Sequence, residues 1–283
     1  MRSGRPRLLV ALLVAVLTVG CGGQQPPPSI PVGATAAPES QVVANLYAAA
    51  LRFYGNPAHV QEAHDPLRAL DSGEIEVAPV FTGQMLHRLD PESPARSDAQ
   101  VYRTLLSALP EGIAAGDYTV SAQDKPALAV TEQVAQAWPD QDVSQVAQRC
   151  SDLTLGAVRG RPGPESVGTC ELPPAGEFSD DAALFDALGA GLIDAAWTTT
   201  AAPDVPSGVV VLSDTTALVR AENLVPLYRR NELTESQVLA LNEIAGVLDT
   251  GSLADMRRQV AEGAEPAAVA GRWLDAHPLG IGN

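Results

Sequence analysis

Short apolar segments with strand-like patterns alternate with amphipathic segments of helical spacing along most of the 283-residue chain. Residues 74–81 alternate between polar and apolar side chains, as a strand does, and residues 84–89 follow with a helical pattern. The same elements return in the second half, where a helix over 181–188 precedes a strand over 192–197. This alternation predicts an α/β fold in which helices cover both faces of a sheet.

The two halves share a pattern of helix end, glycine turn and strand, at 70–78 and at 188–196. Each strand is predicted to end in an aromatic residue, Phe81 or Trp197, and a threonine follows each of them. Ligands in open α/β sheets bind beyond the carboxyl ends of the strands. We therefore expect two lobes that face a shared cleft. Further elements are predicted as strands over 29–32, 118–122 and 127–131 and as helices over 38–51, 234–247, 252–262 and 266–276.

Residues 1–20 have the pattern of an export signal. Three arginines precede an uncharged apolar run over 8–19, which is short for a membrane-spanning helix. The run ends in small residues before Cys21 and resembles the lipobox of bacterial lipoproteins. We expect a signal peptide over 1–20, a lipidated Cys21, a flexible tether over 21–28 and a protein held at the extracytoplasmic face of the cell membrane. The alternative is simple secretion with cleavage near the same point.

The chain contains three cysteines. If Cys21 carries lipid, an even pair remains in a compartment that permits disulfides. We expect a bond between Cys150 and Cys170, which would contribute about 3 kcal/mol by the loop-entropy model. The alternative is two separate buried thiols.

Charge and missing motifs narrow the function. A formal net charge of −16 argues against a nucleic acid partner and against surface attraction to anionic lipid. The chain lacks a nucleophile elbow, a phosphate loop, a dinucleotide fingerprint after a strand and the helical zinc motif. His59 and His64 are five residues apart, which is off the face that a helical metal pair requires. We expect no enzyme, metal or cofactor, but the capture of a solute or a partner.

Residues 69–83 read ALDSGEIEVAPVFTG. This segment resembles a motif of the glycine betaine, choline and carnitine family of ABC-transporter substrate-binding proteins. Other matching segments follow in the family's order and cover roughly 30–275. They are residues 30–33, 39–51, 109–112, 122–131, 193–199 and 223–226.

The resemblance implies a two-lobed type II periplasmic-binding fold, with residues 29–122 and 215–283 in one lobe and 123–214 in the other. An osmoprotectant-like solute (glycine betaine, choline, carnitine or a divergent ligand) would bind in the cleft, and the lobes would close on it. The closed form, a monomer, would then dock on a membrane permease that a separate ATPase powers. The alternative is a divergent scaffold that acts as a cell-envelope interaction protein without transport.

The family's pocket holds a quaternary ammonium group in an aromatic box, because a methylated cation donates no hydrogen bonds and ring faces attract it. Phe81 and Trp197 keep a ring, whereas Pro126 and Glu222 stand at positions that are aromatic in the family. Glu222 could attract a cation by its charge or face solvent at the rim, and the two rings could be core residues instead. The ligand-binding residues that the resemblance implies are Thr35, Ser40, Phe81, Thr82, Gln84, Lys125, Pro126, Arg161, Trp197, Thr198, Glu222 and Asn223.

Overall fold

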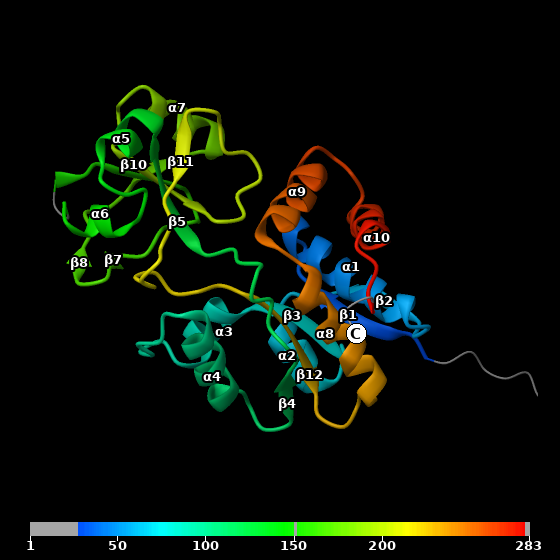
Figure 1. Ribbon diagram of the computed structural model, residues 1–283. Helices are drawn as coiled ribbons and strands as arrows, with labels where there is room; N and C mark the ends of the chain where they lie inside the picture. The colour runs from blue at the N-terminus through cyan, green and yellow to red at the C-terminus, as the bar shows by residue number, and fades with distance from the viewer. Residues whose placement is uncertain (1–27, 150–151, 281–283) are drawn as a thin grey trace, which may run out of the picture.

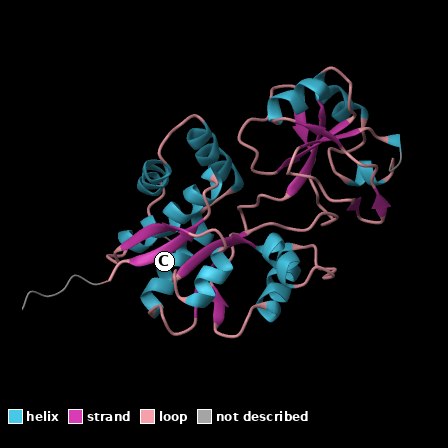
Figure 2. Ribbon diagram, turned by 180° about the vertical axis from the view of Figure 1, so that it is seen from behind, coloured by secondary structure: helices cyan, strands magenta, loops and turns pink. Residues whose placement is uncertain are grey.

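The structure is a computed structural model that describes residues 28–149 and 152–280. Its strands form two five-stranded sheets and one small hairpin. We call the parts built around the two large sheets the first unit and the second unit. Two segments without regular strand or helix join the units: residues 116–125, the first connecting segment, and residues 212–223, the second connecting segment (Figures 1 and 2).

The first sheet has the strand order β2-β1-β3-β12-β4. Its parallel strands are β1 (Ile30–Ala34), β2 (Ala58–Glu62) and β3 (Val77–Phe81), whereas β12 (Leu224–Arg229) runs antiparallel to both β3 and β4 (Ile113–Ala115). Because β1 and β3 are parallel, their carboxyl ends meet at one edge of the sheet. A ligand site is expected at that edge.

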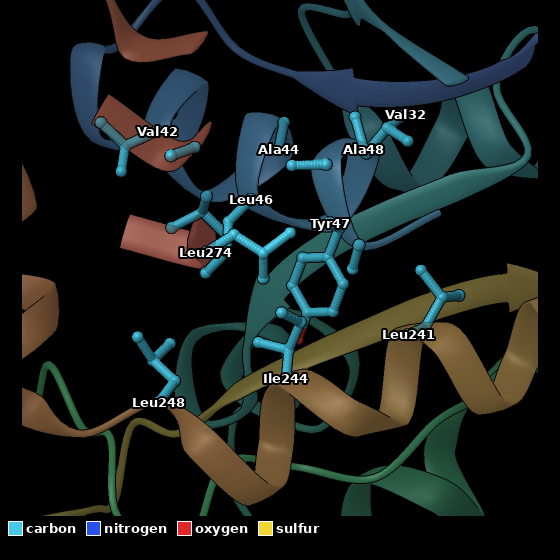
Figure 3. Close-up of a cluster of buried hydrophobic side chains, with 14 of the residues drawn as sticks. Val32, Val42, Ala44, Leu46, Tyr47, Ala48, Leu241, Ile244, Leu248 and Leu274 are labelled. Carbon is cyan, nitrogen blue, oxygen red and sulfur yellow. The ribbon is translucent and has the colours of Figure 1, made fainter. Parts of the chain in front are cut away.

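Helices cover both faces of the first sheet. On one face α1 (Pro38–Phe53) packs with α8 (Glu235–Val247), α9 (Thr250–Ala261) and α10 (Pro266–Ala276) in a single apolar cluster, which Figure 3 shows around Tyr47. The side chain of Val77 belongs to this cluster. Its neighbour Ala78 belongs to a second cluster with α2 (Pro66–Ser72), α3 (Thr82–Leu89) and α4 (Asp98–Ala108). Successive strand residues point to opposite faces, so both faces are buried.

The second sheet has the order β11-β5-β10-β6-β9. Its strands are β5 (Pro126–Thr131), β6 (Leu155–Val158), β9 (Gly176–Phe178), β10 (Ala195–Thr199) and β11 (Val209–Val211). β6 runs parallel to β10 and β9, whereas β5 runs antiparallel to β10 and β11. The carboxyl ends of β6 and β10 therefore share an edge with the start of β5, where the chain enters from the first unit.

Three helices and the hairpin complete the second unit. The helices are α5 (Glu132–Ala137), α6 (Ser144–Ala147) and α7 (Asp181–Gly189), and the hairpin pairs β7 (Ser166–Val167) with β8 (Cys170–Glu171). Two buried clusters lie on the two faces of the sheet, as in the first unit. No helix within residues 28–149 and 152–280 has the length and apolar character needed to cross a lipid bilayer.

The pattern analysis predicted most elements, with a few errors. The strand predicted over 118–122 is wrong, because those residues form irregular chain with a bend at its end. β2, β4 and β12 were not predicted as strands. β10 continues beyond Trp197 to Thr199, so Trp197 lies inside its strand rather than at the end.

The strands of the first sheet come from residues 30–115 and 224–229, whereas those of the second sheet come from 126–211 without interruption. On this basis we propose the lobe limits 29–122 with 215–283, and 123–214. The signal peptide of residues 1–20, Cys21, nearly all of the tether and Cys150 lie outside the described residues. Cys170 is buried in β8, and its bond to Cys150 stays a prediction.

Candidate functional site

A pocket of about 310 Å³ lies at the carboxyl ends of β1 and β3, next to the start of α1. We call it the first-sheet pocket. Most of the lining residues are apolar and come from α1, α2, α3, β3, β12 and the residue before α1. Its polar and aromatic lining comes from Thr35, Glu39, Ser40, Phe81, Gln84 and Arg88.

The turn between β1 and α1 is closed by its own hydrogen bonds. The backbone N–H of Thr35 donates to Ser40 Oγ at 2.9 Å, and the side-chain amide of Gln41 donates to the Thr35 carbonyl at 2.7 Å. Pro38 opens the helix with a backbone angle that suits a first turn, and the acidic Glu39 follows in that turn. The first turn of α1 therefore brings Glu39 and Ser40 to the pocket wall.

The turn between β3 and α3 is fastened to the second connecting segment. Thr82 N–H donates to the Asn223 carbonyl at 2.9 Å, and Asn223 N–H donates to Thr82 Oγ1 at 3.0 Å. Glu222 Oε2 accepts the N–H groups of Gly83 and Gln84, both at 2.9 Å. These bonds hold Phe81, the last residue of β3, and Gln84 in place on the pocket wall.

Glu222 is thus a buried cap of α3, 6% exposed, and lies outside the first-sheet pocket. Burial raises its pKa from the ordinary 4.5 to about 8, and the two backbone N–H groups offset part of this rise. Gly83 is required here, because a Cβ would clash with the Ala221 carbonyl and the Glu222 carboxylate. The carboxylate therefore does not lie at a solvent-exposed rim, and its contact with a solute stays a prediction.

Trp197 lies in the core of the second unit, with 5% of its surface exposed. Gly163 lies so close to the indole that a Cβ would clash with the ring. Part of the ring lines a second cavity of about 800 Å³, the second-sheet pocket, together with Pro162, Glu165 and Glu171. Phe81 and Trp197 therefore line two different pockets, one in each unit, and their joint contact with a solute stays a prediction.

The other predicted ligand residues lie outside both pockets. Lys125 pairs with Asp214 at 3.0 Å, and its N–H donates to Thr200 Oγ1 at 3.0 Å. Arg161 pairs with Asp181, in the first turn of α7, at 2.7 Å. The remaining three are buried or half-buried structural residues: Pro126 faces Thr199 across the sheet, Thr198 faces Ala127, and the amide of Asn223 donates to the Thr119 carbonyl.

The pattern analysis missed Glu39 and Arg257. Glu39 borders the first-sheet pocket, and its carboxylate pairs with Arg257 of α9, 218 positions along the chain. Arg257 also pairs with Asp124 at 2.6 Å. Burial lowers the pKa of Arg257, but the two carboxylates outweigh burial and raise it. The spacing of residues in the sequence does not reveal this contact, because Glu39 and Arg257 each fit the ordinary pattern of a separate helix.

The site offers hydroxyl, amide, carboxylate and ring groups, but little that would hold a metal. In the part of the chain that the structure describes, no group of three or more His, Cys, Asp or Glu side chains is placed to bind an ion. The first-sheet pocket therefore has the character of a binding site, with one aromatic ring and several polar groups in its lining.

Comparison with known proteins also indicates a binding protein. The family model described as the substrate binding domain of ABC-type glycine betaine transport system matches residues 28–276. No curated protein matches the chain. Solved structures with similar folds are a glycine betaine/carnitine/choline ABC transporter, with 17% identity and a TM-score of 0.73 over 88% of this chain and 98% of the other. Apo YehZ from Escherichia coli has 18% identity and a TM-score of 0.69 over 88% and 99%. A choline binding protein in complex with choline has 15% identity and a TM-score of 0.55 over 88% and 89%.

Proposed function

The chain belongs to the family of substrate-binding domains of ABC-type glycine betaine transport systems, and from this premise we propose that it binds a quaternary ammonium solute in the first-sheet pocket. The protein is a two-lobed solute-binding subunit of an ABC importer and not an enzyme. The observation that carries the choice of solute is that Phe81 and Glu39 both line the first-sheet pocket.

The physical argument concerns a cation that donates no hydrogen bonds. A trimethylammonium group spreads its charge over methyl surfaces, so a ring face and a nearby carboxylate stabilise it better than neutral acceptors do. Phe81 is half-buried, which leaves part of its ring accessible while the turn bonds hold it rigid. A similar fold is known in complex with choline, which supports this solute class.

We propose that the second unit closes over the solute. The carboxyl end of β6 and Trp197 of β10 line the second-sheet pocket, where Glu165 and Glu171 supply negative charge. Rotation about the two connecting segments would bring this pocket over Phe81. In this arrangement Trp197 supports the pocket loop through Gly163.

We propose that the loaded protein, a monomer, delivers its solute to a membrane permease driven by a separate ATPase. The apolar run over 8–19 and the residues before Cys21 support export and a lipid anchor at the outer face of the membrane. We also propose that Cys150 bonds to Cys170 in this oxidising compartment.

Thermal shift and calorimetry with choline, glycine betaine and carnitine test the proposal. A solute that binds only the folded protein raises the melting temperature. Phe81→Ala is expected to weaken binding about tenfold, within the range of a cation–π contact. Phe53→Ala is the control, because Phe53 is 53% exposed at the far end of α1.

Two results would count against the proposal. If none of the three solutes shifts the wild-type melting temperature, the solute class is wrong, and an interaction protein without transport is favoured. If Phe81→Ala binds as tightly as wild type, the solute lies elsewhere than in the first-sheet pocket.

A further inference from the structure

Arg257 joins three parts of the chain through one side chain. Its guanidinium is 11% exposed and pairs with Asp124 in the first connecting segment and with Glu39 at the start of α1. It also donates to the carbonyl of Ala201, which follows β10 of the second unit, at 3.2 Å. A helix of the first unit therefore holds chain of the second unit directly.

The start of the same helix holds the same connecting segment. Thr250 N–H donates to the Ser121 carbonyl at 3.0 Å, and Gln123 N–H donates to Thr250 Oγ1 at 3.0 Å. Thr250 and Arg257 lie about two helical turns apart on α9. Helix α9 therefore lies along residues 121–124 and contacts them at two places. Figure 1 shows α9 on a side of the first unit that faces the second unit.

Residues 121–125 are also where the other crossing chains meet. Asp124 N–H donates to the Glu222 carbonyl in the second connecting segment at 2.8 Å. Thr200 N–H donates to the Lys125 carbonyl at 2.9 Å. Any rotation of one unit against the other must turn the chain at this point, so the bonds of Arg257 resist that rotation.

The charges around Arg257 do not balance. One guanidinium faces two carboxylates, and the cluster therefore carries a net negative charge. The Glu39 side chain is 50% exposed and borders the first-sheet pocket, whereas the Asp124 side chain is 8% exposed. Because Glu39 borders the pocket, a cation bound there would compete with Arg257 for its carboxylate.

We propose that Arg257 is a positioning residue that clasps the two units in the arrangement of this structure, and that a cationic solute loosens this clasp by drawing Glu39 away. The second half rests on the proposed function, whereas the clasp itself does not. Coupling between sites is reciprocal, so a weakened clasp makes solute binding tighter.

Amide hydrogen exchange of the solute-free mature protein tests the clasp. Arg257→Ala is expected to speed exchange about tenfold at residues 121–125 and 200–202, since charge-assisted bonds that hold these segments are lost. Arg258→Ala is the matched control: Arg258 is the next residue of α9, and its ion pairs with Asp255 and Glu262 stay within the helix. Equal exchange in the two variants would overturn the clasp.

Calorimetry with choline tests the coupling. Arg257→Ala is expected to bind choline several-fold more tightly than Arg258→Ala, because Glu39 no longer has a competitor. Glu39→Gln, which leaves the bonds of Arg257 to Asp124 and Ala201 in place, is expected to bind choline about tenfold more weakly. If Arg257→Ala fails to fold, Glu39→Gln tests the coupling by calorimetry. Arg257→Lys then replaces Arg257→Ala in the exchange experiment.

The outcomes separate this inference from the proposed function. If Arg257→Ala exchanges faster but binds choline like the control, Arg257 has only a structural role and the coupling is wrong. If the wild type binds no quaternary ammonium compound, the proposed function and the coupling both fail, while the exchange result still decides the clasp.

Discussion

Most buried polar side chains of the first unit form hydrogen bonds. Thr82 and Glu222 do so at the start of α3. Among the described residues, the hydroxyl of Tyr47 and the indole N–H of Trp273 are buried without a hydrogen-bond partner. Tyr47 is fully buried, and burial raises its pKa far above the ordinary value. A polar atom in this state reduces the free energy of unfolding.

We predict that Tyr47→Phe stabilises the protein by about 1 kcal/mol, because it removes an unsatisfied hydroxyl and keeps the ring that packs against Leu241 and Ile244. Urea unfolding measures the change. Tyr102→Phe is the matched control, since the Tyr102 hydroxyl donates to the Gly116 carbonyl at 2.7 Å and its loss should destabilise by a similar amount. A loss of stability in Tyr47→Phe would show that the hydroxyl has a partner.

Glu222 predicts a dependence of stability on pH. Its pKa is raised from 4.5 to about 8, so between these values the folded protein binds more protons than the unfolded chain. The contribution is therefore fully present below the lower value and is lost as the pH rises through the upper one. Glu222→Gln mimics the neutral acid, and we expect its free energy of unfolding to fall less than that of wild type between about pH 5 and about pH 9.

The control for this experiment is Asp65→Asn. A hydrogen bond from Arg88 is the main cause that lowers the pKa of Asp65 to about 2, so its contribution is lost only in acid, below the window of Glu222. The Glu222 interpretation fails if Glu222→Gln and wild type show parallel pH profiles across that window.

The sequence predicted site residues best where the contacting residues are close together along the chain. The Thr35–Ser40 turn and Phe81 were assigned to the site from short motifs, and they border one pocket. Glu222 bonds to Gly83 across 139 positions, and Glu39 pairs with Arg257 across 218. No spacing in one sequence encodes such contacts. The sequence shows that residue 222 is a glutamate, but only the fold shows which groups its carboxylate contacts.

At the scale of elements, helices were predicted better than strands. Helix α8 is capped by Thr234, whose side chain forms a reciprocal capping box with Gln237, and α10 has the predicted limits 266–276. β2 was missed because its sequence AHVQE is half polar at a sheet edge, and β4 because three residues give no periodicity. Trp197 was assigned to a strand end because the strand pattern seemed to stop there, while two threonines extend β10.

The loop before β7 is shaped by its contact with β10. We predict that Gly163→Ala moves this loop away from Trp197, because an added methyl group would clash with the indole. The expected result is a loss of about 1–3 kcal/mol, as for overpacking in a core, with a shift of tryptophan emission. Urea unfolding followed by fluorescence measures both. Gly189→Ala, in α7 with open space around a Cβ, should leave both unchanged, and an equal effect in the two variants would contradict the contact.

At the scale of the whole molecule, the two large sheets lie in separate units that two chain segments join (Figure 2). The α/β class was predicted from the alternation of strand and helix patterns, and the two-lobed fold from the order of motifs. Both of these signals persist at low sequence identity. The relative position of the two pockets was not predictable, because it depends on bonds at residues 121–125 rather than on any motif.

We predict that saturating choline makes the molecule more compact. Closure of the second unit over the first-sheet pocket shortens the distance between the units, so the radius of gyration from small-angle X-ray scattering should fall. Phe81→Ala at the same choline concentration is the control and should keep the solute-free value. Calorimetric saturation with an unchanged radius would exclude closure as the response to choline.

The return of the chain to the first sheet imposes an order on folding during synthesis. β12 and the helices α8, α9 and α10 lie behind residue 223, yet they complete the sheet and cover the apolar side of α1. A growing chain cannot bury that side until residues 224–276 have left the ribosome. The second unit, whose strands are contiguous, is complete earlier and can fold first. The early part of the first unit therefore stays available to chaperones until those residues are made.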